Sequence, residues 1–254
     1  MQRFTDKVVI VTGAGSGIGE ATARRFSQEG ASVVLAGDTR PKLERVAADL
    51  PPGRTLVCVT DVAKYSQVED LVARTVMQFG GLHVLVSNAG IAPEGTVVDG
   101  RLEDWEKTMA VNAGGVFHGA RAAMPYLIQS RGNIVNTASV SGLGGDWSLA
   151  FYNASKGAIV NLTRAMAMDH GKDGVRVNAV CPSLTMTPMT ADLEGNARAM
   201  AKFCERIPLG RPAQPFEIAA AIAFLASEDA SFITGINLPV DGGVTASNGQ
   251  PSMG

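Results

Sequence analysis

The sequence predicts one doubly wound α/β domain, a seven-stranded parallel sheet with helices on both faces. Apolar, β-branched runs of the kind buried on both sides of a sheet alternate with helical stretches along the 254 residues. The first run, 7–12, enters a helix through the glycine-rich turn 13–19, which is typical of the Rossmann type. No linker or repeat interrupts the alternation, so residues 1–254 are expected to form a single domain.

Each element can be placed from its own pattern. Strands are expected at 7–12, 31–36, 55–60, 82–87, 132–137, 175–180 and 236–240. Helices are expected from the glycine turn to Gly30 and over 41–50, 65–79, 152–170 and 215–226, with one long or broken helical region over 102–128. Gly114 and Gly115 are expected to mark the break in that region.

Composition argues against several classes of protein. The 22 Lys and Arg residues nearly balance 24 Asp and Glu, so neither nucleic acid nor an acidic membrane surface is an expected partner. No apolar run approaches the roughly 18 residues of a membrane span, and a strand begins too early for a signal peptide. Cys58, Cys181 and Cys204 are far apart and lack a C-x-x-C pair. We expect them to be buried, reduced thiols of a cytoplasmic protein, with no metal site.

A serine, a tyrosine and a lysine form the strongest chemical pattern. Ser139 follows the strand 132–137, and Tyr152 and Lys156 are four residues apart on a predicted helix. Residues at this spacing share a helix face, and an ammonium beside a phenol lowers the pKa of the phenol toward neutrality. A Tyr-x-x-x-Lys pair alone is most often an exposed helix pair, so the rest of the chain must support the assignment.

The glycine-rich turn predicts an anion site. Backbone N–H groups and the dipole of the following helix would point at a phosphate, and glycine allows its close approach. Asp38 follows the second strand, 19 residues after Gly19, near the position of an acid that binds an adenosine ribose. The alternative is a plain tight turn, since the spacing is not G-x-G-x-x-G.

Taken together, these motifs resemble the short-chain dehydrogenase/reductase family over essentially the whole chain. The motifs are Thr12-Gly13 to Gly17-Ile18-Gly19, Asp61-Val62, Asn88-Ala89-Gly90, Asn112, Ser139, Tyr152-x-x-x-Lys156, Pro182 to Thr187 and Val240-Asp241-Gly242-Gly243. The resemblance implies that Tyr152 is the general acid in ketone reduction and the base in alcohol oxidation. It also implies that Lys156 lowers the pKa of Tyr152 and binds the nicotinamide ribose, that Ser139 holds the substrate oxygen, and that Asn112 anchors a water in a proton path.

The resemblance also implies a nicotinamide cofactor, which carries the hydride chemistry. The implied cofactor-binding residues are Gly13, Ser16, Gly17, Ile18 and Gly19 at the pyrophosphate, Asp38 at the adenosine ribose, Asp61 and Val62 at the adenine, Asn88, Ala89 and Gly90 under a ribose, Thr187 at the carboxamide, and Pro182, Tyr152 and Lys156. Two positions depart from the family: Ser183 replaces a glycine, and Gly37 stands where the acid that selects NAD usually lies. Asp38 should still repel a 2′-phosphate, so NAD is favoured over NADP; Arg40 is the counter-argument.

A narrower resemblance concerns the substrate. Residues 137–147 and the tail 245–251 look like those of bacterial acetoin reductases, also called 2,3-butanediol dehydrogenases. This implies an oxidoreductase acting on a secondary alcohol or ketone, with acetoin and 2,3-butanediol as candidates, and Trp147 at the substrate or a pocket wall. Residues 183–212, rich in Met and Thr, are expected to form a substrate lid.

Two other functions compete. A 3-oxoacyl-carrier-protein reductase would need a basic docking patch, for which Arg121 and Arg131 are candidates. A non-catalytic nucleotide sensor would be expected to lack the serine, tyrosine or lysine. A homotetramer is also expected, from an apolar side on the helix 157–168, an edge strand within 230–240 and the usual state of the family.

Overall fold

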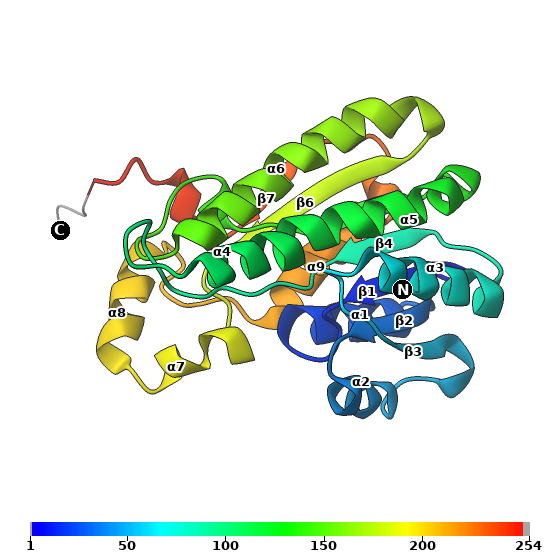
Figure 1. Cartoon of the computed structure of the whole chain (residues 1–254), viewed down its shortest axis with the longest axis horizontal. Helices are drawn as coiled ribbons and strands as arrows, with labels where there is room; N and C mark the ends of the chain where they lie inside the picture. The colour runs from blue at the N-terminus through cyan, green and yellow to red at the C-terminus, as the bar shows by residue number, and fades with distance from the viewer. Residues whose placement is uncertain (1, 251–254) are drawn as a thin grey trace.

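The computed structural model describes residues 2–250 and contains the predicted parallel sheet (Figure 1). The seven strands lie in the order β3-β2-β1-β4-β5-β6-β7, and all six pairings are parallel. They are β1 (Val8–Thr12), β2 (Ser32–Gly37), β3 (Thr55–Val59), β4 (Val84–Ser87), β5 (Asn133–Thr137), β6 (Arg176–Pro182) and β7 (Asn237–Val240). The strand order reverses between β1 and β4, the point where ligands bind in doubly wound sheets.

Helices connect the strands and cover both faces of the sheet. They are α1 (Gly17–Gln28), α2 (Arg40–Ala47), α3 (Tyr65–Phe79), α4 (Leu102–Thr108), α5 (Gly115–Ser130), α6 (Ala150–His170), α7 (Ala191–Glu194), α8 (Ala197–Arg206) and α9 (Pro215–Ala226). Short 3₁₀ turns lie at Pro52–Arg54, Val140–Gly142, Gly171–Asp173, Pro188–Thr190, Glu228–Ala230 and Val244–Ala246.

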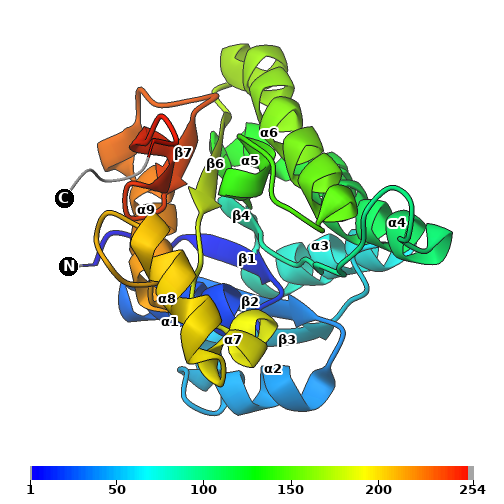
Figure 2. The ribbon, with the colours of Figure 1, turned by 90° about the vertical axis from the view of Figure 1, so that its left-hand side faces the viewer.

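Strand β1 shows how the two apolar layers arise. Successive side chains of a strand point to opposite faces, so Val9 and Val11 join one core and Ile10 joins the other. The first core includes residues of α1, α2 and α9, and the second includes residues of α3, α5 and α6. Figure 2 shows these helix groups on opposite sides of the sheet. This two-sided burial explains why β1 reads as an unbroken apolar run.

The region predicted as one long or broken helix contains a π-helical stretch. Residues Met109–Gly114 form it between α4 and α5, with helical backbone angles at both ends. Gly115 keeps an α-helical φ of −59°, but a Cβ there would come within 2.8 Å of Val62 Cγ2. The glycine therefore permits close packing against the loop after β3, and the change of helix type falls where the sequence predicted a break.

The segment 183–212 leaves the sheet after β6 and carries α7 and α8 outside the main body (Figures 1 and 2). Its ends are tied together: Met186 N donates to Ala213 O at 2.9 Å, and Ala213 N donates to Leu184 O at 2.9 Å. No residue of α8 is buried. Leu209 N also donates to Gly242 O after β7 at 3.1 Å, so the segment is a flap that is held at its base and carries α7 and α8 above it.

The cysteines agree only in part with the sequence prediction. Cys58 and Cys181 are buried, but Cys204 on α8 is half-buried. Cys204 differs from the prediction because it lies on α8, none of whose residues is buried.

Candidate active site

The main cleft opens at the carboxyl edge of the sheet and has a volume of about 670 Å³. Most of the predicted site residues line it: Gly13, Ser16, Gly17, Ile18, Asp38, Asp61, Val62, Asn88, Ala89, Gly90, Ser139, Tyr152, Lys156, Pro182 and Thr187. Gly19, Asn112 and Trp147 do not line it. Residues from six strand ends therefore meet in one space, as expected where the strand order reverses.

The glycine turn has the backbone geometry of a cradle. Gly13 and Gly17 have φ of +66° and +54°, values that L-residues rarely adopt. Gly19 is needed for packing, because a Cβ on it would lie 2.1 Å from Gly13 O. Its role is thus to let α1 approach the turn, while the turn itself faces the cleft.

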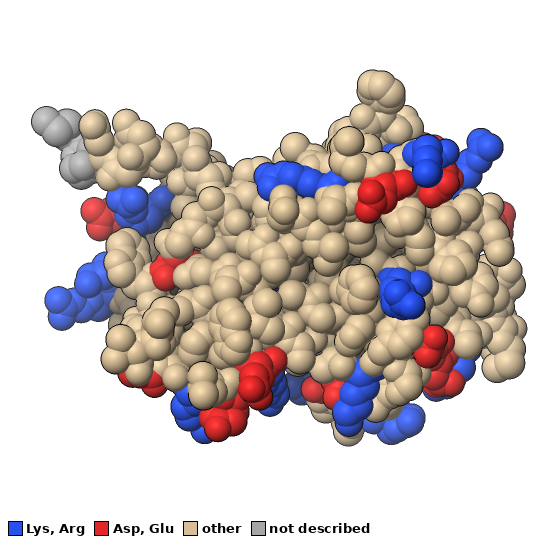
Figure 3. All heavy atoms as spheres, turned by 45° about the horizontal axis from the view of Figure 1, so that its top comes forward, with Lys and Arg blue, Asp and Glu red and all other residues tan. Residues whose placement is uncertain are grey.

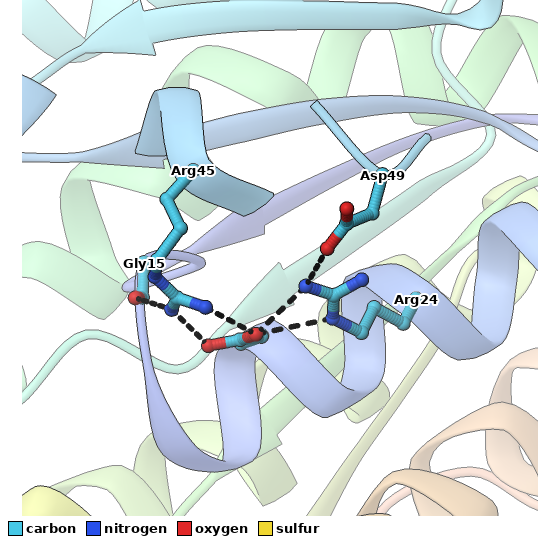
Figure 4. A network of polar contacts seen from close by, with 5 residues as sticks. Gly15, Arg24, Arg45 and Asp49 are labelled. Carbon is cyan, nitrogen blue, oxygen red and sulfur yellow. Dashed lines mark hydrogen bonds and ion pairs between the residues drawn. The ribbon is translucent and has the colours of Figure 1, made fainter. Parts of the chain in front are cut away.

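Helix α2 holds this turn from outside through an ion-pair network (Figure 4). Arg45 Nη2 donates to Gly15 O at 3.1 Å, and Arg45 also pairs with Glu20 in the first turn of α1. Arg24 bridges Glu20 and Asp49, at 3.0 and 2.8 Å. Glu20 and Arg24 are four residues apart on α1, but Arg45 and Asp49 come from α2 and the turn after it, so the complete network depends on how the fold brings these segments together.

Tyr152 and Lys156 meet as their spacing predicted. Lys156 Nζ lies 5.4 Å from the centre of the Tyr152 ring and donates to Thr137 O at 2.7 Å. Lys156 is buried, and burial lowers its pKa to about 8. Burial also raises the pKa of Tyr152, and a hydrogen bond donated by Ser139 to the phenol oxygen would oppose that rise. The direction for Tyr152 is opposite to the sequence expectation, because desolvation of the phenolate is the largest effect on its pKa.

Asn112 lies behind the cleft within the π-helical stretch. It is fully buried, and its Nδ2 donates to Ile91 O and Ser155 Oγ, both at 2.9 Å. Its Oδ1 accepts from Ile91 N at 2.9 Å. Ser155 in turn donates to Tyr152 O at 2.8 Å, so the side chain of Asn112 ties the loop after β4 to helix α6. Its predicted role in a proton path stays a prediction.

Ser139 is the first member of a short hydroxyl chain. Its Oγ donates to Ser141 Oγ at 3.0 Å, and Ser141 Oγ donates to Asp146 Oδ2. Ser141 is a further site residue, and its signal in the sequence is the Ser-x-Ser spacing before the loop. Trp147, beside Asp146, is 92% exposed, so the prediction that it forms a pocket wall has no support in this chain alone.

The charges near Asp38 bear on the cofactor. Asp38 lines the cleft and accepts from Thr39 Oγ1 at 2.8 Å. Arg40, the residue that would favour NADP, pairs with Glu44 at 3.3 Å and stays exposed.

Ser183 stands where the family usually has glycine. Its hydroxyl donates to Asp241 O at 3.0 Å, which connects the start of the flap to the end of β7.

Comparison with known proteins supports the chemistry that this geometry suggests. A family profile described as enoyl-(acyl carrier protein) reductase matches residues 13–245. The chain is also 32% identical to a short-chain dehydrogenase/reductase from Caenorhabditis elegans whose solved structure superposes with a TM-score of 0.91, covering 97% of this chain and 98% of that one. The chain belongs to the short-chain dehydrogenase/reductase family.

Among its relatives in this family is a meso-2,3-butanediol dehydrogenase from Serratia marcescens, 53% identical over 251 residues and 99% of each chain. A 3-oxoacyl-[acyl-carrier-protein] reductase from Thermotoga maritima is 39% identical over 95% of this chain and 99% of its own. The levodione reductase structure superposes with a TM-score of 0.89 at 35% identity, covering 96% of this chain and all of that one. As a member of this family, the present chain is an NAD(P)-dependent oxidoreductase acting on alcohols and ketones.

Two further observations describe this family member. No helix within residues 2–250 is long and apolar enough to cross a bilayer. On the face in Figure 3, basic and acidic side chains are interspersed, and neither sign forms a large patch.

Proposed function

We propose that this enzyme uses NAD(H) to interconvert a small secondary alcohol and its ketone, with the 2,3-butanediol and acetoin pair as the first candidate. The observation that carries the proposal is the convergence of Ser139, Tyr152 and Lys156 in one cleft. The 53% identity to a meso-2,3-butanediol dehydrogenase over 99% of both chains supports the choice of substrate. A reducing, cytoplasmic setting is part of the proposal, since the three cysteines are free.

The residues present fit a nicotinamide dinucleotide. The cleft runs from the glycine turn past Asp38 to Tyr152. Gly13 and Gly17 have positive φ, and a Cβ would come within 2.9 Å of Asn88 Nδ2 or 3.1 Å of Thr187 Cγ2, so the turn that faces the cleft requires glycine at both positions. Gly13, Ser16, Gly17 and Ile18 would hold the pyrophosphate, Asp38 the adenosine ribose, and Asp61 and Val62 the adenine. Asn88, Ala89 and Gly90 would lie under a ribose, with Pro182 and Thr187 at the nicotinamide. When bound, the cofactor supplies or accepts the hydride.

The chain's own residues would supply position and proton transfer. Tyr152 Oη would give a proton to the ketone oxygen in reduction and take one from the hydroxyl in oxidation. Ser139 would hold that oxygen in place. Lys156 would bind the ribose and stabilise the phenolate form of Tyr152, and Asn112 would hold the loop after β4 beside Ser155.

The cofactor preference rests on Asp38. Its carboxylate would repel a 2′-phosphate on the adenosine ribose, and Arg40 is already paired with Glu44. We expect a higher kcat/KM with NADH than with NADPH, and we expect Asp38→Ala to narrow the difference. Equal kcat/KM values for wild type would show that Asp38 does not contact the ribose.

One assay tests the substrate assignment. Purified enzyme is given acetoin, diacetyl, acetoacetyl thioester and a panel of secondary alcohols, each with both cofactors. Turnover of acetoin or diacetyl well above the thioester supports the proposal, and a preference for the thioester would favour the acyl-carrier-protein alternative. The structure weakens that alternative, because Arg131 lies directly before β5, at the edge opposite the cleft, and Arg121 stacks on Tyr65 at 5.8 Å.

A further inference from the structure

The chain of hydroxyls behind Ser139 has a fixed direction. A carboxylate can only accept hydrogen bonds, so Ser141 must donate its hydroxyl proton to Asp146. The Ser141 oxygen is then an acceptor and receives the Ser139 proton at 3.0 Å. Ser141 N donates back to Ser139 Oγ at 3.1 Å, which fixes the two side chains relative to each other. Pro182 O, at 3.4 Å, is a second and longer acceptor for Ser139.

The loop that carries Asp146 is itself held to the active-site helix. Asp146 N donates to Asn153 Oδ1 at 3.2 Å, and Asn153 Nδ2 donates to Asp146 O at 2.9 Å. Asn153 directly follows Tyr152 on α6. These bonds hold the Asp146 backbone at a defined place against α6, while Ser139 and Ser141 are both buried.

We propose that Asp146 and Ser141 form a relay that draws the Ser139 hydroxyl proton away from Tyr152, so that Tyr152 keeps its own proton in the free enzyme. Tyr152 and Ser139 line the same cleft. While the Ser139 proton points to Ser141, it cannot stabilise a phenolate on Tyr152. Asp146 and Ser141 are thus positioning residues that act through Ser139, and the relay favours the acid form of Tyr152 that ketone reduction requires.

Other charged groups around the tyrosine must be separated from this effect. Lys156 approaches the ring from the same helix, and Lys107 of α4 lines the same cleft. The charge of a Cys181 thiolate on β6 would raise the pKa of Lys156. Asp146 also raises the pKa of Tyr152 directly through its charge. Replacing Ser141 changes no charge, so it isolates the relay.

A titration without substrate tests the relay. The chain has 3 tyrosines, so the ultraviolet absorbance of tyrosinate in each variant, minus that of the same variant carrying Tyr152→Phe, reports Tyr152 alone. Ser141→Ala should lower the titration midpoint of Tyr152 by about half to one pH unit, because Ser139 is then free to donate to the phenolate. Asp146→Asn should lower it further, since its charge is also lost. Asp70→Asn, at an exposed site on α3, is the charge control and should not shift it.

A second comparison covers the case in which Ser141→Ala does not fold. In a Ser139→Ala background the relay has no proton to move, so Asp146→Asn should shift the midpoint less than it does in wild type. An unchanged or raised midpoint in Ser141→Ala, or equal Asp146→Asn shifts in both backgrounds, would overturn the proposal. The relay rests on the proposed role of Tyr152, but the titration needs no turnover. Inactivity toward alcohols and ketones would therefore count against the proposed function and leave the relay test intact.

Discussion

At the scale of single residues, Tyr152 carries the proposed proton transfer. Tyr152→Phe keeps the ring and removes the transferable proton, so kcat should fall by about 100-fold or more while NADH still binds. Steady-state kinetics and a fluorescence titration with NADH measure the two quantities. Tyr126→Phe, a half-buried tyrosine on α5, is the matched control and should retain turnover. Near-normal turnover of Tyr152→Phe would remove Tyr152 from the mechanism.

Lys156 makes a prediction about stability and pH. Burial lowers its pKa to about 8, so between pH 8 and about 10.4 the unfolded chain binds a proton that the folded protein has released. The free energy of unfolding should therefore rise with pH in this window. Lys156→Met lacks this contribution, so wild type should gain about 2 kcal/mol relative to the variant between pH 7.5 and 10.

Urea unfolding of both cofactor-free proteins at these two pH values measures the difference. Lys172→Met, at an exposed lysine, is the control and should run parallel to wild type. If wild type and Lys156→Met lost or gained stability equally with pH, Lys156 would not be held in the desolvated state described above.

At the scale of elements, most helices and strands could be predicted because local signals and tertiary structure agree. Helix α3 has its predicted bounds, since an amphipathic pattern ends at Gly80, which has φ of +79°. The π-helical stretch could not be predicted, because its side-chain bonds join Asn112 to Ile91, 21 residues earlier. The Ser139 to Asp146 chain was missed for a similar reason: its direction depends on which donors the fold brings within reach.

The flap at 183–212 is the element that we propose as a substrate lid. Thr187, at the start of the turn Pro188–Thr190, forms a capping box with Thr190, and Met189 is 55% exposed although it lines the cleft. Bound cofactor would give Thr187 and Met189 something to pack against, so NADH should order the flap. We expect NADH to slow trypsin cleavage at Arg198, Lys202 and Arg206 of α8 several-fold.

Mass spectrometry of the fragments gives the cleavage rates at each site. Cleavage at Lys172, in the exposed turn Gly171–Asp173, is the internal control and should be unaffected by NADH. Equal protection at every site would indicate general stabilisation, and no protection in α8 would argue against a lid.

At the scale of the whole molecule, the exposed apolar side chains include two groups on different elements. Beside the edge strand β7, Phe232 and Ile236 are 103% and 41% exposed, and Phe117 and Trp105 are exposed on α5 and α4. On helix α6, which is expected to supply one interface, Ile159 and Met166 pack inside the chain, whereas Ala165 and Met168 are exposed. Two self-complementary surfaces on different sides generate a dimer of dimers.

We therefore expect a homotetramer, which light scattering at micromolar concentration can measure. Phe232→Glu places a charge in the β7 surface and should reduce the mass to that of a dimer, while Glu228→Gln beside it should leave the tetramer intact. A wild-type monomer would contradict the prediction. The expected reach of the tail 248–254 toward a neighbouring subunit falls partly on 251–254, outside the described residues. Deleting 248–254 tests it, because an unchanged mass, Tm and KM would show that the tail makes no such contact.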